Sequence, residues 1–278
     1  MSDAAVIRKR NGRFVIRKMT APRLALNLTL AILAAVTVVG FATIDTQGVN
    51  LLAASGQALE GFVKMFTQPA AHHFRLVDGL LALLTTLALA FMTTILGAVV
   101  ALGLGLLAAG NLTNRKVSAV IKGFCSFIRA VDTLMWVLVF AIGAGLGAVA
   151  AVIGMSFHTV GYLVKAYSEA FEELDQGVID ALKASGATPL QIIFQTVIPS
   201  SITYILSWTF FRFEINFAVA VAMGAAAGAG GIGYQLWMAA GYYMDISEIG
   251  LITILLLGVA LIMEFIALRL KARFHIQG

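Results

Sequence analysis

The chain has 278 residues, of which 60% are hydrophobic and only 12% are charged, and its mean hydropathy is +0.93. Soluble domains carry about twice that share of charged residues, so one globular core cannot bury this much apolar surface. The composition excludes an ordinary soluble protein and indicates that a lipid bilayer surrounds much of the chain.

Seven basic residues crowd the N-terminus and contribute much of the net charge of +5. A basic cluster directly before an apolar run is typical of a cytoplasmic anchor, and this reading is favoured over a nucleic-acid patch. Residues 1–23 are therefore predicted to be a cytoplasmic N-terminus, with membrane lipid rather than nucleic acid as a partner. The basic residues are Arg8, Lys9, Arg10, Arg13, Arg17, Lys18 and Arg23.

The first apolar run covers residues 24–44, contains no charge and is long enough to cross a bilayer, which takes about 20 residues. It exceeds the apolar stretch of about 7–15 residues in a signal peptide, so we expect a retained transmembrane helix. Residues 45–78 are mixed and polar. They are predicted to form an extracytoplasmic loop with a short amphipathic helix near residues 51–66.

Five further spans are expected between residues 79 and 273. The second, residues 79–109, is uncharged and longer than the hydrocarbon core is thick, so it is tilted or protrudes. Its glycines Gly97, Gly103 and Gly105 favour either close helix packing or local flexibility. The other spans are predicted at residues 124–142, 148–170, 196–223 and 249–270, with a glycine turn at residues 143–147.

The distribution of basic residues predicts the orientation. Six crossings from a cytoplasmic N-terminus return the C-terminus to the cytoplasm, so the basic segments at residues 8–23, 115–122 and 269–273 fall on one side. The polar segment at residues 172–195 falls there too, and the external loops hold few basic residues. The sequence therefore predicts an all-α membrane protein of about six transmembrane helices with both termini in the cytoplasm.

Residue patterns typical of catalysis or metal binding are not found in the sequence. A single cysteine, Cys125, excludes an internal disulfide, and the four histidines lack liganding partners at metal-site spacing. No Ser/His/Asp pattern, phosphate-binding glycine loop or carboxylate pair suited to catalysis stands out. We expect no enzyme activity, no metal and no bound cofactor in this chain, so its energy source must lie in a partner.

The segment at residues 172–195 lies between two spans and is too polar to cross the membrane. Asp180, Ala181, Ala184 and Ala187 share one helical face, and small residues on a face let another surface approach closely. This pattern predicts either a short cytoplasmic helix that enters a groove on a partner or an ordinary amphipathic connector.

A turn follows this helical face. Gly186 permits a sharp turn, and Thr188 followed by Pro189 suits the start of a new helix. The candidate partner-docking residues are Asp180, Ala181, Ala184, Ser185, Gly186, Ala187, Thr188 and Pro189.

The same segment resembles the cytoplasmic loop motif of binding-protein-dependent ABC importer permeases, which reads Glu-Ala-Ala, three residues, Gly, nine residues and Ile-x-Leu-Pro. Residues 180–182 read Asp-Ala-Leu, the glycine is Gly186, and residues 196–199 read Thr-Val-Ile-Pro. The departures are mild except Leu182, which is expected to change the docking fit slightly. The resemblance implies that residues 180–189 form a coupling helix that docks on an ATP-hydrolysing subunit.

Four further stretches resemble the permeases of phosphonate importers, over roughly residues 80–274. They read Ile-Arg-Ala-Val-Asp, Phe-His-Thr-x-Gly, Phe-Arg-Phe-Glu-x-Asn and Gly-Ala-Gly-Gly-Ile-Gly, and they begin at residues 128, 157, 211 and 228. Methionine-type permeases carry a similar glycine loop, so the Arg-Phe-Glu stretch is the more specific match.

The resemblance implies a type I ABC importer permease fold, with its core at residues 79–273, in a bacterial plasma (inner) membrane. It further implies a homodimer above two ATP-binding cassette subunits, which carry ATP and Mg, and an extracytoplasmic substrate-binding protein. The expected function is a permease subunit that imports phosphonate, phosphate or a related phosphorus oxyanion. Open alternatives are a methionine-type or other small-solute permease, and a channel or scaffold without an ATPase partner.

Charged residues inside the spans need a partner or a wet cavity. Arg129 and Asp132 are three residues apart and are predicted to form an ion pair on one helix. Arg212 and Glu214 are two residues apart on the fifth span, so they point to different faces and each needs another partner. The candidate partners, both on the fourth span, are His158 and Lys165.

Arg212, with Glu214 and His158, is a candidate for lining the translocation path. A guanidinium offers a bidentate fork to a phosphorus oxyanion, which favours this role. The alternative is that Arg212 and Glu214 hold helices or protomers together.

The glycine-rich loop before the last span lies outside in the predicted topology. Its glycines favour close backbone approach, either at a two-fold interface or against the docked binding protein. A flexible loop without a role is the alternative. The glycines are Gly228, Gly230, Gly231 and Gly233.

Overall fold

The computed structural model describes residues 8–10, 13–15, 21–43, 48 and 50–274. Parts of the predicted basic N-terminus, at residues 1–7, 11–12 and 16–20, lie outside the described residues. The chain divides into two units by its internal contacts, residues 1–57 and residues 58–278, and each is described by itself. The division falls inside a helix of the predicted external loop, whereas the sequence places the core boundary at residue 79.

The first unit contains a short hairpin and one long helix. Strands β1 (Arg8–Arg10) and β2 (Arg13–Val15) pair antiparallel, with Arg8 opposite Val15. An Asn-Gly pair, which favours two-residue hairpin turns, separates them in the sequence. Helix α1 (Ala21–Thr43) buries none of its side chains. Its largely apolar, exposed surface is that of a helix solvated by lipid, as expected for the first span.

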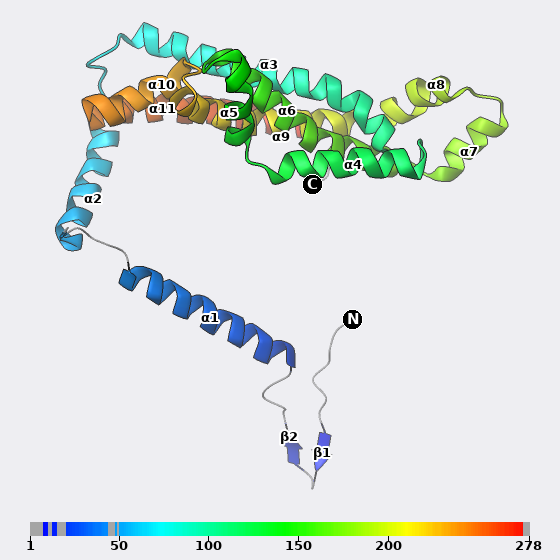
Figure 1. The fold of residues 1–278 in the computed structure, drawn as a ribbon, viewed down its shortest axis with the longest axis horizontal. Coiled ribbons are helices and arrows are strands. Elements are labelled where there is room, and N and C mark those ends of the chain that lie inside the picture. The colour runs from blue at the N-terminus through cyan, green and yellow to red at the C-terminus, as the bar shows by residue number, and fades with distance from the viewer. Residues whose placement is uncertain (1–7, 11–12, 16–20, 44–47, 49, 275–278) are drawn as a thin grey trace. The chain divides into compact units, whose positions relative to one another are not determined.

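The second unit consists mostly of helices that are twelve residues long or longer (Figure 1). They are the C-terminal part of α2 (Leu51–Thr67), then α3 (Leu76–Ala108), α4 (Arg115–Ala130), α5 (Thr133–Ala144), α6 (Ala148–Glu172), α9 (Ile198–Ala226) and α11 (Ile246–Phe274). Short elements join them: α7 (Gln176–Ala184), α8 (Pro189–Ile192), η1 (Ile193–Val197), α10 (Gly231–Trp237) and η2 (Met238–Tyr243). The short helix expected near residues 51–66 is present as α2.

Among the described residues, five helices are long and apolar enough to cross a membrane. They begin at Ala21, Leu76, Ala148, Pro189 and Ile246. A sixth span is formed if α4 and α5 count as one broken crossing. The all-helical membrane fold with about six spans is therefore confirmed, with the small hairpin as an addition.

Helix α6 is the centre of the core, and small residues let its neighbours approach it closely. A β-carbon on Gly97 of α3 would overlap Thr159 of α6, and one on Gly105 would lie 3.0 Å from the Tyr167 side chain. Gly103 faces open space. Two of the three glycines of this span therefore serve close packing, which replaces hydrophobic drive as the source of helix association in lipid.

The third span predicted at residues 124–142 is broken near its start. Helices α4 and α5 are bent by 93° at a short break. The Asp132 side chain causes the break, because its Oδ1 accepts a hydrogen bond of 2.8 Å from the Leu134 backbone N–H and so begins a new helix. The Trp136 Nε1 then donates to the Ile128 carbonyl across the bend, at 3.0 Å.

The close contact of Gly154 on α6 with Val137 on α5 predicts that a larger residue at position 154 destabilises the fold. A β-carbon added at Gly154 would lie 2.6 Å from the Val137 Cα, so Gly154→Ala must push α5 away from α6. We expect it to lower the free energy of unfolding by about 1–3 kcal/mol, a typical cost of overpacking. Gly103→Ala, which places its methyl group in open space, is the matched control. Thermal unfolding in detergent measures both, and equal melting temperatures would contradict the packing argument.

Candidate functional site

The segment between α6 and α9 forms a small helical projection at one end of the second unit, where Figure 1 shows α7 and α8 beyond the ends of α3 and α6. The Asp175 side chain begins α7 by accepting a 2.8 Å hydrogen bond from the Gly177 N–H. On the inner side, Ile179 is 1% exposed and belongs to an apolar cluster with Phe171 of α6 and Val197 of η1. The projection is therefore anchored by its apolar side to the helices that cross the membrane.

The outer side of α7 presents the predicted docking face. Asp180, Ala181, Ala184 and Ser185 are all exposed. Ala187 differs, because it is partly buried against the apolar cluster. The small-residue face is thus available to a partner surface, but it is one residue shorter than the sequence pattern indicates.

The turn after α7 has the geometry that the sequence predicts. Gly186 has a φ of +84°, which side chains other than glycine rarely adopt. Thr188 then caps α8: its Oγ1 accepts from the Gln191 N–H at 3.4 Å, and the Gln191 Oε1 accepts from the Thr188 N–H at 2.8 Å. Pro189 occupies the first turn, where its missing N–H costs nothing.

Leu182 does not lie on the exposed face. It is partly buried and packs against the apolar cluster under α7. The expectation that it changes the docking fit is therefore wrong. Its larger side chain strengthens the anchor of α7, because a leucine on the inner side buries more apolar surface than an alanine.

A buried polar network joins α6 and α9. Arg212 is only 4% exposed, and its Nη2 lies 3.0 Å from the His158 Nδ1 while its Nε donates to the Thr159 Oγ1 at 3.3 Å. The guanidinium also lies over the Tyr162 ring, 4.6 Å from the centroid. His158 is therefore a partner of Arg212, whereas Lys165 pairs with Glu169 at 3.7 Å.

The network extends to two more helices through hydroxyl and amide groups. The Thr133 Oγ1 of α5 lies 2.8 Å from the His158 Nδ1. The Asn216 Nδ2 of α9 donates to Thr159 at 3.0 Å and to the Thr94 Oγ1 of α3 at 2.9 Å. Sequence reasoning missed Thr94 and Thr133, because a threonine on an apolar helix gives no local signal of a distant partner.

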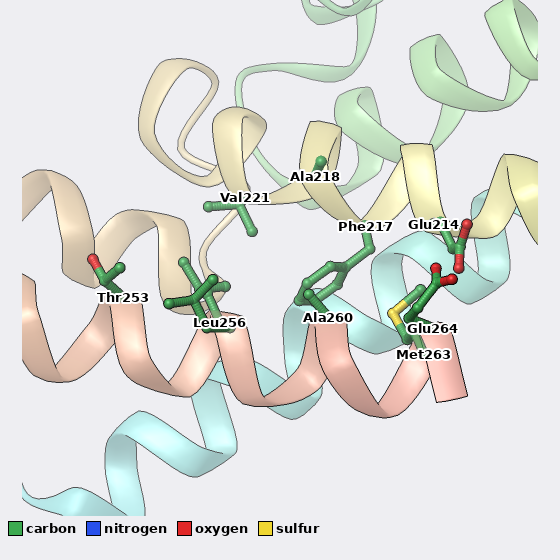
Figure 2. Close-up of a pocket in the computed structure, with 10 residues that line it drawn as sticks. Glu214, Phe217, Ala218, Val221, Thr253, Leu256, Ala260, Met263 and Glu264 are labelled. Atoms are coloured by element: carbon green, nitrogen blue, oxygen red, sulfur yellow. The ribbon is translucent and has the colours of Figure 1, made fainter. Parts of the chain in front are cut away.

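Glu214 lies on another face of α9, as its spacing from Arg212 predicts. It lines a cavity of about 480 Å³ between α9 and α11. Figure 2 shows its carboxylate near that of Glu264, above an otherwise apolar wall that includes Phe217 and Met263. The structure therefore does not bring Glu214 together with the His158–Arg212 network.

The predicted ion pair between Arg129 and Asp132 is not among the ion pairs of the described residues. The two residues lie on different sides of the bend, because α4 ends at Ala130 and Asp132 caps α5. The Arg129 Nη2 instead donates to the Ser126 Oγ at 3.0 Å. The sequence spacing assumed one continuous helix, and the cap at Asp132 breaks it.

The glycine loop folds back on its own chain. Gly228, Gly230 and Gly231 have φ values between +64° and +79°. A β-carbon on Gly231 would overlap the Thr86 hydroxyl, which accepts a 3.0 Å hydrogen bond from the next backbone N–H, and one on Gly233 would overlap the Val221 carbonyl. The close backbone approach at Gly231 and Gly233 is therefore made to α3 and α9 of the same chain, whereas a β-carbon on Gly228 or Gly230 would face open space.

A histidine and carboxylate cluster joins the start of α3 to the start of α11. The His73 Nδ1 lies 2.8 Å from the Glu248 Oε2, and His72 contacts Asp245. The Glu248 side chain is 1% exposed, and the His73 ring stacks on Tyr243 at 3.7 Å. His73, Asp245 and Glu248 place their ligand atoms within 4.8 Å of one another. This grouping was not predictable from residue spacing, because the partners are more than 170 residues apart.

The cluster predicts acid sensitivity. The hydrogen bond from His72 lowers the pKa of the Asp245 carboxyl below its ordinary value of 3.8. A carboxyl with a depressed pKa stabilises the fold above its ordinary pKa, and that stabilisation is lost as the pH falls through the lower folded value. We therefore expect the melting temperature in detergent to fall between about pH 5 and about pH 3.

Asp245→Asn is the diagnostic variant for this prediction. It should melt at a lower temperature at neutral pH and lose less on acidification, and Glu60→Gln on the exposed part of α2 is the matched control. An Asp245→Asn protein that loses as much stability in acid as the unchanged chain would contradict the assignment.

Comparison with known proteins places these features in a family. The family model described as "Binding-protein-dependent transport system inner membrane component" matches residues 101–275. The chain is 30% identical over 193 residues to a phosphite transport system permease protein of Stutzerimonas stutzeri, covering 69% of this chain and 70% of that one. It is 29% identical over 194 residues to a phosphate-import permease protein of Mycolicibacterium smegmatis, covering 69% of this chain and 36% of that one.

The fold is also similar to a solved structure. An inward-facing MetNI methionine ABC transporter chain matches 72% of this chain and 95% of its own length, with a TM-score of 0.64 and 21% identity. At this identity the likeness supports the fold alone. The matched family region includes α7, the turn at Gly186, Arg212 and His158.

Proposed function

We propose that this chain, which belongs to the family of binding-protein-dependent transport system inner membrane components, is the permease subunit of an ATP-driven importer for a phosphorus oxyanion. The observation that carries the proposal is the anchored projection at α7, which lies in the region matched to the family. The names of the two relatives, a phosphite and a phosphate permease, favour phosphite, phosphate or phosphonate as the solute.

The projection is suited to transmit movement. Its outer face offers small side chains to a partner, and its inner residues Ile179 and Leu182 pack against α6 and the start of α9. Ser201 of α9 also donates to the Ala170 carbonyl of α6 at 3.2 Å. A displacement of α7 would therefore move the ends of two spans together, because close-packed interiors transmit strain.

The proposed assembly contains two copies of this chain above two ATPase subunits. One chain provides one projection, so two ATPase subunits require two copies. ATP with Mg would bind to the ATPase subunits and close them against each other. The projections would carry this movement into the membrane and open the path to the outside. An extracytoplasmic binding protein would deliver the solute. In this arrangement the chain crosses a bacterial inner membrane, and both termini and α7 lie on its cytoplasmic side, as the basic segments favour.

Arg212 and His158 are proposed to act at the wall of the path. A residue that is 4% exposed is too deep to contact a passing solute, so Arg212 acts from behind Tyr162, which is 43% exposed. Glu214 belongs to the separate cavity against α11, where it is proposed to border the path from another side. The network therefore holds the wall in place and supplies positive charge near it.

Arg212→Leu tests this role. The change removes the hydrogen bonds from Arg212 to His158 and Thr159, so we expect it to cost about 1–3 kcal/mol of unfolding free energy and to reduce the amount of assembled complex. Arg115→Leu, at the exposed start of α4, is the control. Uptake per assembled complex separates the roles: a normal value with a normal melting temperature would contradict any part for Arg212 at the wall.

The proposed function predicts uptake that depends on the projection. Cells that express this chain with its partner ATPase and binding protein should take up phosphite, inorganic phosphate or methylphosphonate, and the ATPase should purify with the chain. Ala184→Glu places a charge on the docking face, and we expect it to reduce both uptake and ATPase recovery by about tenfold or more.

Ala184→Ser keeps the small side chain and is the matched control, with near-normal uptake expected. Competition by excess methionine would indicate a methionine-type permease instead. A purified chain without any ATPase would favour a channel or scaffold. Uptake that persists in Ala184→Glu would remove the docking face from the mechanism.

A further inference from the structure

A second cavity, of about 360 Å³, opens between α4, α6 and α9 on the side of the Tyr162 ring that is not covered by protein. Two cations, one carboxylate and two aromatic rings form most of its wall. Lys165 is seven residues before the end of α6, so the cavity lies in the cytoplasmic half of the proposed topology. The lining residues are Arg129, Tyr162, Lys165, Ala166, Glu169 and Trp208.

The positive charge of this cavity is only partly balanced. Lys165 pairs with Glu169 at 3.7 Å, and both side chains are about half exposed. Arg129 forms no ion pair with any described carboxylate, and its one hydrogen bond, to Ser126, uses one of five guanidinium donors. An arginine at membrane depth normally has a carboxylate, a carbonyl or a wet cavity as partner. Arg129 lines the cavity, and its Nη1 is buried without a hydrogen-bond partner among the described residues.

Tyr162 brings a third cation to the same place. The Arg129 guanidinium lies 5.9 Å from the centre of its ring and that of Arg212 lies 4.6 Å from it. One exposed aromatic ring therefore contacts two guanidinium groups, with Lys165 along the same wall. Arg129, Lys165 and Arg212 surround Tyr162 while Glu169 is the one carboxylate in the cavity lining, and this arrangement favours an anion as ligand.

We propose that this cavity binds the oxyanion group of a phosphorus acid. The planar Arg129 guanidinium would donate to two oxygens, and Lys165 would supply a point charge. The volume leaves room for an organic substituent against Tyr162 and Trp208. The inference rests on the proposed function for the identity of the carried solute, and it adds a binding step at the cytoplasmic half of the path to the wall role proposed for Arg212 and His158.

Binding is measured through Trp208, which lies in the cavity wall. The purified full chain is placed in phosphatidylcholine nanodiscs, in a Trp136→Phe, Trp237→Phe background that leaves Trp208 as the reporter. Titration with inorganic phosphate at constant ionic strength should give a saturable change of fluorescence. Chloride at the same ionic strength should give none.

Variants of the two cations in the cavity wall, Arg129 and Lys165, test whether the signal comes from this cavity. Arg129→Gln and Lys165→Gln should each raise the apparent Kd for phosphate by about tenfold or more, because each removes a charge-assisted hydrogen bond. Arg129→Lys retains the charge but not the planar, bidentate guanidinium, so its apparent Kd should lie between those of the unchanged chain and of Arg129→Gln. Arg115→Gln, an exposed arginine at the other end of α4, should bind as the unchanged chain does. Melting temperatures identify any variant that fails to fold.

The same oxyanion chemistry is offered by lipid headgroups, so a second arm uses nanodiscs with phosphatidylglycerol. Phosphate that still titrates with little loss of affinity identifies the soluble anion as the ligand. A signal set by phosphatidylglycerol and unaffected by phosphate identifies the lipid phosphate. In either case, binding must be weakened in Arg129→Gln and in Lys165→Gln.

The proposal is overturned if neither arm gives a saturable signal, or if both glutamine variants bind like the unchanged chain. These outcomes are distinct from failure of the proposed function. If cells take up no phosphorus anion while phosphate binding and its dependence on Arg129 hold, the transport assignment falls and the site stands. If uptake is normal and the cavity binds nothing, the reverse is true.

Discussion

The structure depends most on the apolar anchor beneath α7. Ile179 and Leu182 pack into a cluster that also contains Phe171 of α6 and Val197 of η1. This contact turns a polar connector between two spans into a rigid projection, so its exposed face is held in a fixed place relative to the membrane helices. Without it, α7 is a nine-residue helix that is too short to persist alone in water, and the docking face would have no defined position.

The membrane helices meet a second constraint, which is the cost of charge in lipid. Arg212 is accommodated by His158, Thr159 and the Tyr162 ring, all on one turn and a half of α6. These contacts tie α9 to α6 at mid-span, while the anchor under α7 ties them at one end. A movement delivered to α7 is thereby passed to a pair of helices fixed at two points, with the positively charged cavity beside them.

Local signals explain what the sequence predicts well. Long uncharged runs identify spans because bilayer thickness sets their length, and Gly186, Thr188 and Pro189 act on the backbone within one turn. The bend at Asp132 was missed because an averaged apolar run hides a single capping residue. The grouping of His73 with Glu248 and the self-packing of the glycine loop depend on long-range contacts that spacing cannot reveal. The need of Arg212 for a partner was predictable from its depth, and His158 was found in this way.

The central claim is that the face at Ala184 is cytoplasmic and covered by an ATPase. A Cys125→Ala, Ala184→Cys chain carries one reporter thiol, because Cys125 is the chain's single native cysteine. A membrane-impermeant maleimide should label it in inside-out vesicles stripped of the ATPase, label it poorly when the ATPase is bound, and leave it untouched in right-side-out vesicles. Labelling from the external side, or equal labelling with and without the ATPase, would contradict the account.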